Sequence, residues 1–173
     1  MFEPRFPLLS YDALTSEQRT IHDRLSSGPR GGVSGPFRAW LYSPKLANGL
    51  VEVGNHLRFD SRLTKRMIEH TILLVAFEWE ADFVFTHHAS LAIAEGLSEE
   101  VVEYIRMGRR PPYAREEDFA VHEFVRCLLK GGEIDSVTWD RSAAVLSPEA
   151  MVDLIGLTGY YVMVAMTTKA ARL

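Results

Sequence analysis

The sequence predicts an all-α protein with about seven or eight helices, in a single domain that spans residues 1–173. Helix-capping residues and apolar residues at helical spacing recur along the chain. By contrast, no stretch shows the sustained apolar and polar alternation that is typical of a half-buried strand. A length of 173 residues with 47% hydrophobic residues suits a globular domain with a substantial core.

The first predicted helix begins with a capping-box pattern. Thr15 is followed three residues later by Gln18, and the helix extends through Leu25. The glycine-rich segment 26–36 comes next and lacks both the GxGxxG and the GxxxxGKS pattern of phosphate-binding loops. We therefore interpret it as a connection or a lid.

Ser43 and Pro44 predict the start of the next helix, with serine as the N-cap and proline at the first helical position. Apolar residues follow at spacings of four, three and four, which indicates an amphipathic helix. The predicted apolar face consists of Leu46, Leu50, Val53 and Leu57.

Two apolar helices are predicted in the middle of the chain. The segment Thr64–Phe77 is apolar nearly all round, with Glu69 and His70 as exceptions, so it should pack on several sides or lie in a subunit interface. The segment Ala81–Glu95 is predicted to be a helix ended by Gly96. Its beginning, DFVF, is also compatible with a strand.

Four further helices complete the prediction. Ser98 caps a short helix that ends near Gly108, and the segment 116–130 forms another that is closed by two glycines. Ser136 and the pair Ser147 and Pro148 begin the last two helices.

Composition and charge exclude several classes of protein. The formal charge of -4 is spread along the chain without a basic patch, so we expect no nucleic-acid partner. The N-terminus has no signal-peptide pattern, which predicts a cytoplasmic protein. The most apolar stretch, Met151 to Met166, is shorter than the about 20 residues of a membrane span and contains Asp153, so no membrane segment is expected. Cys127 is the single cysteine and cannot form a Cys-x-x-Cys centre.

The segment 67–105 carries a recognisable order of residues. A glutamate, Glu69, is followed 19 residues later by His88, an alanine-rich stretch, Gly96 and a new helix. This order resembles the signature region of the carboxymuconolactone decarboxylase and AhpD-like family, in which the glutamate precedes a Cys-x-x-Cys-x-x-x-His motif. Counting back from the glycine places Ala81 and Val84 on the two family cysteines. The resemblance extends from about residue 31 to the C-terminus.

The resemblance implies the AhpD-like helical fold and leaves three functions open. It implies a carboxymuconolactone decarboxylase-like lyase that acts on a small cyclic acid or lactone. An AhpD-like alkylhydroperoxidase is disfavoured because Ala81 and Val84 cannot replace a thiolate and its resolving thiol. A non-catalytic ligand-binding protein with the same scaffold is the third alternative.

Glu69, His88 and His87 are the candidate catalytic residues. A carboxylate and an imidazole suit general acid and base catalysis. We assign proton transfer to His88, its orientation to Glu69, and a supporting polar role to His87. Along one unbroken helix 19 residues would span about 28 Å, so the chain must turn between them, and residues 78–80 are the candidate turn. The alternative is structural: Glu69 would be satisfied by His70 or an arginine.

Candidate substrate-binding residues lie on both sides of Glu69. Arg58, Arg62 and Arg66 would form one ridge if their segment were helical, and one of them would hold a substrate carboxylate; a solvated face or a subunit salt bridge is the alternative. Trp79 and Phe83 are candidate pocket walls, unless they belong to the core. Phe85 and Tyr160 are further candidates of the same kind.

No metal or other cofactor is expected. Three pairs have ligand-type side chains, namely His87 with His88, Glu52 with His56, and Asp118 with His122, but no HExxH or paired ExxH motif accompanies them. The expected partner is a small-molecule substrate. The apolar helices and the family resemblance also imply a homo-oligomer, a trimer or a hexamer, with a dimer as the alternative.

Overall fold

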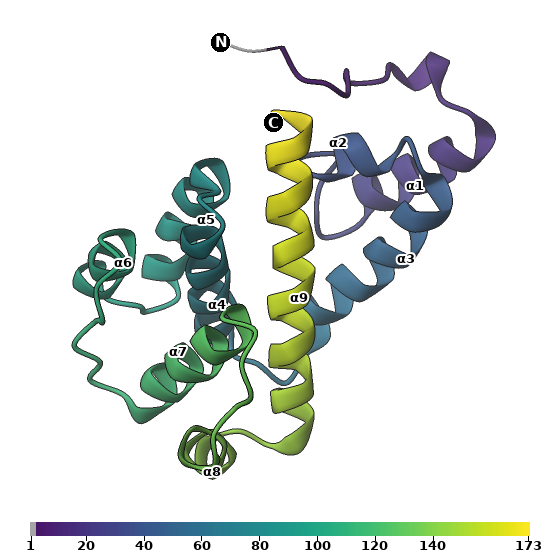
Figure 1. Ribbon diagram of the computed structural model, residues 1–173. Helices are drawn as coiled ribbons and strands as arrows, with labels where there is room; N and C mark the ends of the chain where they lie inside the picture. Colours follow the sequence, from purple (N-terminus) through teal and green to yellow (C-terminus); the bar gives the residue numbers. More distant parts are fainter. Residues whose placement is uncertain (1–2) are drawn as a thin grey trace. The chain divides into compact units, whose positions relative to one another are not determined.

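The computed structural model describes residues 3–173, and every regular element in that range is helical (Figure 1). A 3-10 turn at Tyr11–Ala13 and a π-helical segment at His56–Asp60 accompany the α-helices. The predicted all-α class is confirmed. In the described range the α-helices are α1 (Ser16–Ser27), α2 (Phe37–Trp40), α3 (Pro44–Asn55), α4 (Lys65–Glu78), α5 (Asp82–Ala94), α6 (Glu99–Arg106), α7 (Glu116–Leu129), α8 (Ser136–Val145) and α9 (Pro148–Ala171).

The chain divides into two compact units. One comprises Met1–His56 together with Met166–Leu173, and the other comprises Leu57–Ala165. Helix α9 belongs to the second unit up to Ala165 and to the first unit beyond it. The first unit contains α1, α2 and α3, and the second contains α4 to α8 and most of α9. The single predicted domain stays a prediction.

Local capping chemistry explains where several helices begin. The Thr15 hydroxyl accepts from Gln18 N, and Gln18 Oε1 accepts from Thr15 N, so the predicted capping box is present. The hydroxyls of Thr64 and Ser98 accept backbone N–H groups in the same manner. The predicted start of α8 is confirmed, because Ser136 is its first residue, and the carboxylate of Asp135 caps it.

Helix α3 buries a different face from the one predicted. Leu50, and Leu57 just beyond the helix, lie in the core as expected, but Leu46 and Val53 are exposed. The buried stripe is instead lined by Ala47, Leu50, Val51 and Gly54. Small residues at two of these positions allow close packing. The prediction followed the spacing of the larger apolar residues, which lie partly on another face.

The second unit is built around α4. This helix is buried on nearly every side, as its apolar sequence predicted, and α5 packs along it (Figure 1). The DFVF segment is helical, so the strand alternative is wrong. Helix α6 packs against α4 and α5, and α7 packs against α4 and α8.

Helix α9 is longer than its apolar stretch suggested. It has 24 residues and by length and composition alone could cross a membrane, so its length does not exclude a membrane segment. However, 56% of its most apolar window is buried in the structure, as in the core helix of a globular protein. The expectation that the chain has no membrane segment therefore rests on burial.

Candidate active site

A tight turn brings Glu69 and His88 together. Helix α4 ends at Glu78, Glu80 adopts a left-handed backbone conformation with φ 48°, and α5 begins at Asp82. The turn lies where the sequence predicted it. His88 Nδ1 is 2.5 Å from Glu69 Oε2, and the two residues are only 6% and 5% exposed. The predicted proximity of the pair is confirmed.

Arg58 and Tyr161 complete a four-residue cluster, which we call the Glu69 site. Arg58 Nη2 donates to the other Glu69 oxygen, Oε1, at 3.2 Å, and Arg58 Nη1 donates to the Tyr161 hydroxyl at 3.1 Å. The Tyr161 ring stands edge-on to the His88 ring, with 5.5 Å between centroids. The four side chains come from the π-helical segment, α4, α5 and α9, all within the second unit.

Burial and charge set the protonation states in the Glu69 site. Burial lowers the pKa of His88 below its usual value, and the contact with Glu69 offsets this only in part. Burial alone would lower the pKa of Arg58, but Tyr161 and Glu69 raise it above its usual value. Burial raises the pKa of Tyr161 to about 12. At neutral pH the site therefore holds a neutral imidazole, a neutral phenol and a guanidinium cation.

This arrangement leaves one imidazole nitrogen available for chemistry. Both Glu69 oxygens accept hydrogen bonds, so the proton of the neutral His88 ring belongs on Nδ1, which donates to Glu69. His88 Nε2 then carries a lone pair, and it has no hydrogen-bond partner among the described residues. A carboxylate that orients an imidazole in this way is a standard arrangement for a general base.

The three candidate arginines diverge. The predicted ridge is absent because residues 56–60 are π-helical, residues 61–63 bend, and α4 begins only at Lys65. Arg62 pairs with Glu149 at the surface, and Arg66 pairs with buried Asp118. Of the three, Arg58 alone bonds a member of the predicted catalytic pair.

The other candidates lie around the site in different ways. His87 is exposed, as expected for a helical neighbour of a buried residue, and its ring contacts that of His88 edge-on at 5.0 Å. Trp79 is half-buried in the turn after α4. Phe83 is 60% exposed and so does not form part of a closed wall in this chain. Tyr160 and Phe85 are buried, and Phe85 lies under the Arg106 guanidinium.

Two of the three pairs with ligand-type side chains have their carboxylate in an ion pair with an arginine. Glu52 pairs with Arg24, and Asp118 pairs with Arg66. In residues 3–173 no group of three or more histidine, cysteine or acidic side chains is placed to hold a metal ion.

A second buried polar cluster was not predicted, and we call it the Tyr113 cluster. The Tyr113 hydroxyl lies 2.9 Å from His70 Nε2 and 2.6 Å from His122 Nδ1. Burial lowers the pKa of His70 to about 3 and that of His122 to about 4. Helical spacing places Arg66 beside His70 and Asp118 beside His122, but the sequence does not indicate that Tyr113 lies between the histidines.

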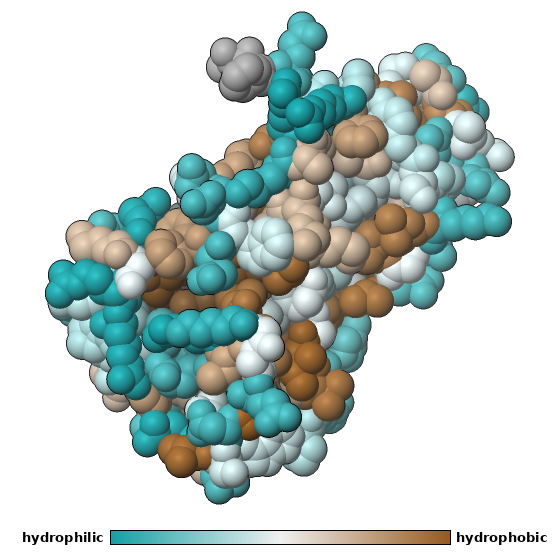
Figure 2. All heavy atoms as spheres, viewed as in Figure 1, coloured by the Kyte–Doolittle hydropathy of each residue, from teal (hydrophilic) through white to brown (hydrophobic). Residues whose placement is uncertain are grey.

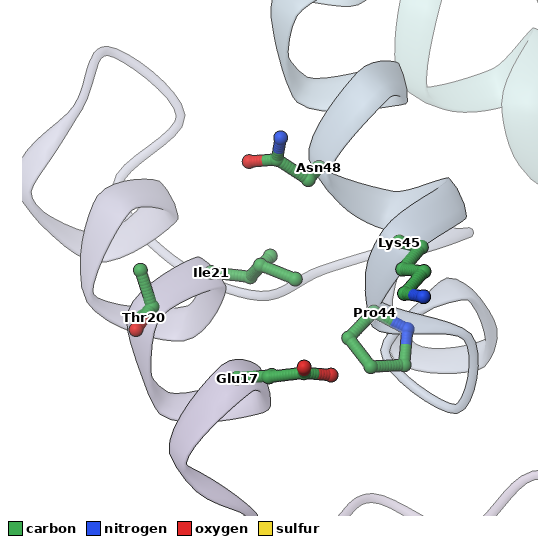
Figure 3. Close-up of a pocket in the computed structure, with 6 residues that line it drawn as sticks. All are labelled: Glu17, Thr20, Ile21, Pro44, Lys45 and Asn48. Atoms are coloured by element: carbon green, nitrogen blue, oxygen red, sulfur yellow. The ribbon is translucent and has the colours of Figure 1, made fainter.

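A surface cleft of about 340 Å³ lies elsewhere, between α1 and α3 in the first unit (Figure 3). Its lining is open and mixed, and it contains no candidate catalytic residue. The cleft is lined by Glu17, Thr20, Ile21, Pro44, Lys45 and Asn48. The Glu69 site, in the second unit, is thus separate from this cleft.

No family model matches the sequence, and no curated protein is significantly similar to it. Solved structures do match. The alkylhydroperoxidase AhpD core of an uncharacterized peroxidase-related protein from Ralstonia eutropha aligns with a TM-score of 0.78 and 14% identity, covering 96% of this chain and 89% of that one. An uncharacterized peroxidase-related protein from Silicibacter aligns with a TM-score of 0.77 and 16% identity, covering 98% and 88%.

A third structure agrees with these two. A protein of unknown function from Agrobacterium tumefaciens, a candidate AhpD antioxidant-defence protein, aligns with a TM-score of 0.67 and 19% identity, over 78% of this chain and 92% of that one. Fold and site together define a helical protein with a buried acid and base pair. The chain has the AhpD-like fold, and its single cysteine excludes the Cys-x-x-Cys pair.

Proposed function

We propose that this protein is a carboxymuconolactone decarboxylase-like lyase that acts on a small cyclic acid or lactone by proton transfer. The observation that carries the proposal is the 2.5 Å contact between His88 Nδ1 and Glu69 Oε2, which leaves Nε2 unpartnered among the described residues. A buried carboxylate and imidazole so arranged can move a proton to or from carbon.

In this reaction His88 transfers the proton, and Glu69 orients the His88 imidazole. Loss of carbon dioxide leaves an electron pair that must be delocalised into a carbonyl group before the carbon is protonated. We assign Arg58 to hold the carboxylate, because of the three candidate arginines it is the one that bonds Glu69. The Tyr161 hydroxyl accepts from Arg58, so its own proton is available to a substrate oxygen.

A thiol peroxidase is the second candidate, because two of the similar structures are called peroxidase-related. That chemistry needs a peroxidatic and a resolving sulfur. The chain has Cys127 alone, on α7, while Ala81, the N-cap of α5, and Val84, within α5, occupy the family cysteine positions. Proton transfer through Glu69 and His88 needs no sulfur.

The proposal is tested by a thermal-shift screen of lactones and ring-cleavage acids, followed by carbon dioxide release assays on the compounds that stabilise the protein. We expect a stabilising compound to be turned over by the wild type and not by Glu69→Gln or His88→Ala. Arg24→Gln, which removes a surface arginine paired with a glutamate, is the matched control and should retain activity. Turnover that survives both site variants would contradict the proposal.

We further propose that the protein assembles into a homo-oligomer, a trimer or a hexamer, with a dimer as the alternative. Hydrophobic side chains reach the surface among hydrophilic ones (Figure 2). On α9 Val152 and Ile155 are exposed, and on α8 Val137 is exposed. Light scattering checks the proposal, and a mass of 19.5 kDa at micromolar concentration would contradict it.

A further inference from the structure

We propose that the Glu69 site binds a carboxylate together with one proton, which His88 holds, so that the acid enters as an electrically neutral pair. This inference rests on the proposed function, because it concerns the same four residues. It adds the charge state in which the substrate is bound and the source of the proton that the reaction consumes.

The charges of the free Glu69 site cancel. In the free site the Arg58 guanidinium is positive, the Glu69 carboxylate is negative, and the two form an ion pair at 3.2 Å. His88 and Tyr161 are neutral, so the four groups sum to zero. A carboxylate that enters adds one buried negative charge, and an uncompensated buried charge is strongly unfavourable.

One group in the Glu69 site can compensate the added charge. Arg58 is already paired with Glu69, and Tyr161 cannot become a cation. His88 can, because its Nε2 is unpartnered among the described residues and its Nδ1 already faces a carboxylate. Protonation at Nε2 gives an imidazolium between two carboxylates, and the site returns to neutrality.

No other charged group near His88 replaces this role. On its own helix the nearest titratable group is exposed His87. From α6, the other helix that packs on α5, Arg106 lies on Phe85 and pairs with Glu103. From α9, Tyr160 lies beside Tyr161, with 5.7 Å between ring centroids.

Arg58 has donors left for a second anion. A guanidinium has five N–H donors, and in the described residues Arg58 uses one to Glu69 and one to Tyr161. Its side chain is 20% exposed, more than that of Glu69 or His88. Three donors, the buried Nε among them, therefore remain for a carboxylate without displacing Glu69.

The coupling matches the stoichiometry of decarboxylation. The bond between the carboxylate carbon and the ring carbon breaks, its electron pair moves into the conjugated carbonyl, and carbon dioxide leaves. The ring carbon then takes the proton from His88 Nε2, so R–COO⁻ and H⁺ become R–H and CO₂. One proton is consumed in each turnover, and the site takes it up with the substrate.

The test uses benzoate, a ring carboxylate with no carbonyl group placed to accept the electron pair, so that it binds without reacting. Calorimetry at pH 7 in two buffers with different ionisation heats gives the number of protons taken up, and we expect one for each benzoate. The affinity should weaken about tenfold for each pH unit between pH 6 and 8.

Variants separate this inference from its alternatives. His88→Gln cannot take a proton, so its proton uptake and pH slope should vanish, whereas His22→Gln, a histidine in the first unit, should keep both. Arg58→Gln should abolish benzoate binding. If circular dichroism shows that this variant does not fold, Arg58→Lys, which retains the charge, takes its place. Binding without proton uptake, uptake that persists in His88→Gln, or no binding at any pH would overturn the inference. A failure to find a decarboxylated substrate bears on the proposed function and leaves the proton count as measured.

Discussion

Glu69 and His70 are neighbours on α4, yet they belong to two buried clusters with opposite proton chemistry. In the Glu69 site a carboxylate and a guanidinium face His88. In the Tyr113 cluster His70 and His122 bond the same neutral phenol. Burial lowers the pKa of all three imidazoles, but in the Glu69 site the carboxylate opposes that shift. The comparison teaches that the partner decides whether a buried histidine can exchange a proton.

The hydrogen-bond pattern of the Tyr113 cluster supports this contrast. Tyr113 has one proton, so one histidine accepts it and the other must donate to the phenol oxygen. His122 is the better acceptor, because its Nδ1 is nearer, at 2.6 Å, and its Nε2–H then faces the Glu123 carboxylate at 3.9 Å. His70 then donates through Nε2. Its buried Nδ1 carries a lone pair and no proton, so it needs no acceptor. The cluster is thus stable only with both imidazoles neutral.

The largest expected effect is acid destabilisation through the Tyr113 cluster. The native pKa of His70, about 3, lies below its unfolded value of about 6.5, so the unfolded state binds more protons as pH falls below 6.5. The free energy of unfolding should therefore decrease from pH 6.5 toward pH 4, with His70 contributing roughly 5 kcal/mol if fully titrated. Burial raises the pKa of Asp118, which opposes this trend at the acid end.

Urea denaturation from pH 7.5 to 4.5 measures this dependence. His70→Leu should reduce the slope, whatever its effect on stability at pH 7.5, and His122 accounts for part of the slope that remains. His22→Gln, which removes a histidine outside the cluster, should leave the slope unchanged. A wild-type free energy that is constant over this range would mean that the Tyr113 cluster accepts protons and that the contrast with the Glu69 site is wrong.

The next effect is catalytic and belongs to the Glu69 site alone. His88→Ala should lower the rate on any substrate found in the screen by about 100-fold or more, the usual cost of losing a general acid or base. His122→Ala removes an equally buried histidine and should leave the rate of the folded protein nearly unchanged. Steady-state kinetics at pH 7.5 compare the two variants. Equal losses in both would indicate that the histidines act through stability.

A smaller effect separates the two tyrosines. Tyr113→Phe leaves two buried imidazoles without their shared partner and should cost about 1–3 kcal/mol of unfolding free energy. Tyr161→Phe removes one of two bonds from a charged and partly exposed Arg58, and it should cost less, about 1 kcal/mol. Urea denaturation at pH 7.5 gives both values, and a larger cost for Tyr161→Phe would reverse the ranking of the two clusters.

The comparison also shows what sequence could and could not predict. Glu69 and His88 are predictable because a local turn at residues 78–80 joins two helices with strong signals. Tyr161 is 103 residues from its partner Arg58, and no spacing rule connects them. The same holds for the 43 residues between His70 and Tyr113. These contacts bring in residues of α9 and of the segment before α7, and local patterns do not encode where those segments pack.

The arginine ridge failed for a different reason. Spacing of four residues gives a common face only in an α-helix, and the segment after α3 is π-helical before it bends. Thr64 marks the beginning of α4, but the sequence gives no signal of the π-helical segment before it. Arg58 therefore turns toward Glu69, whereas Arg62 and Arg66 pair elsewhere.

The smallest expected effect is that of Cys127→Ser. Cys127 is half-buried on α7 and belongs to neither cluster, so its replacement should change activity and stability little. The protein should also not turn over hydroperoxide with a dithiol reductant, because the peroxidatic cycle needs a second sulfur. An external thiol can take the place of a resolving cysteine, so the assay should include glutathione and a thioredoxin-type donor. Catalytic peroxide consumption that disappears in Cys127→Ser and persists in His88→Ala would move the chemistry from the Glu69 site to α7, and both clusters would then be structural.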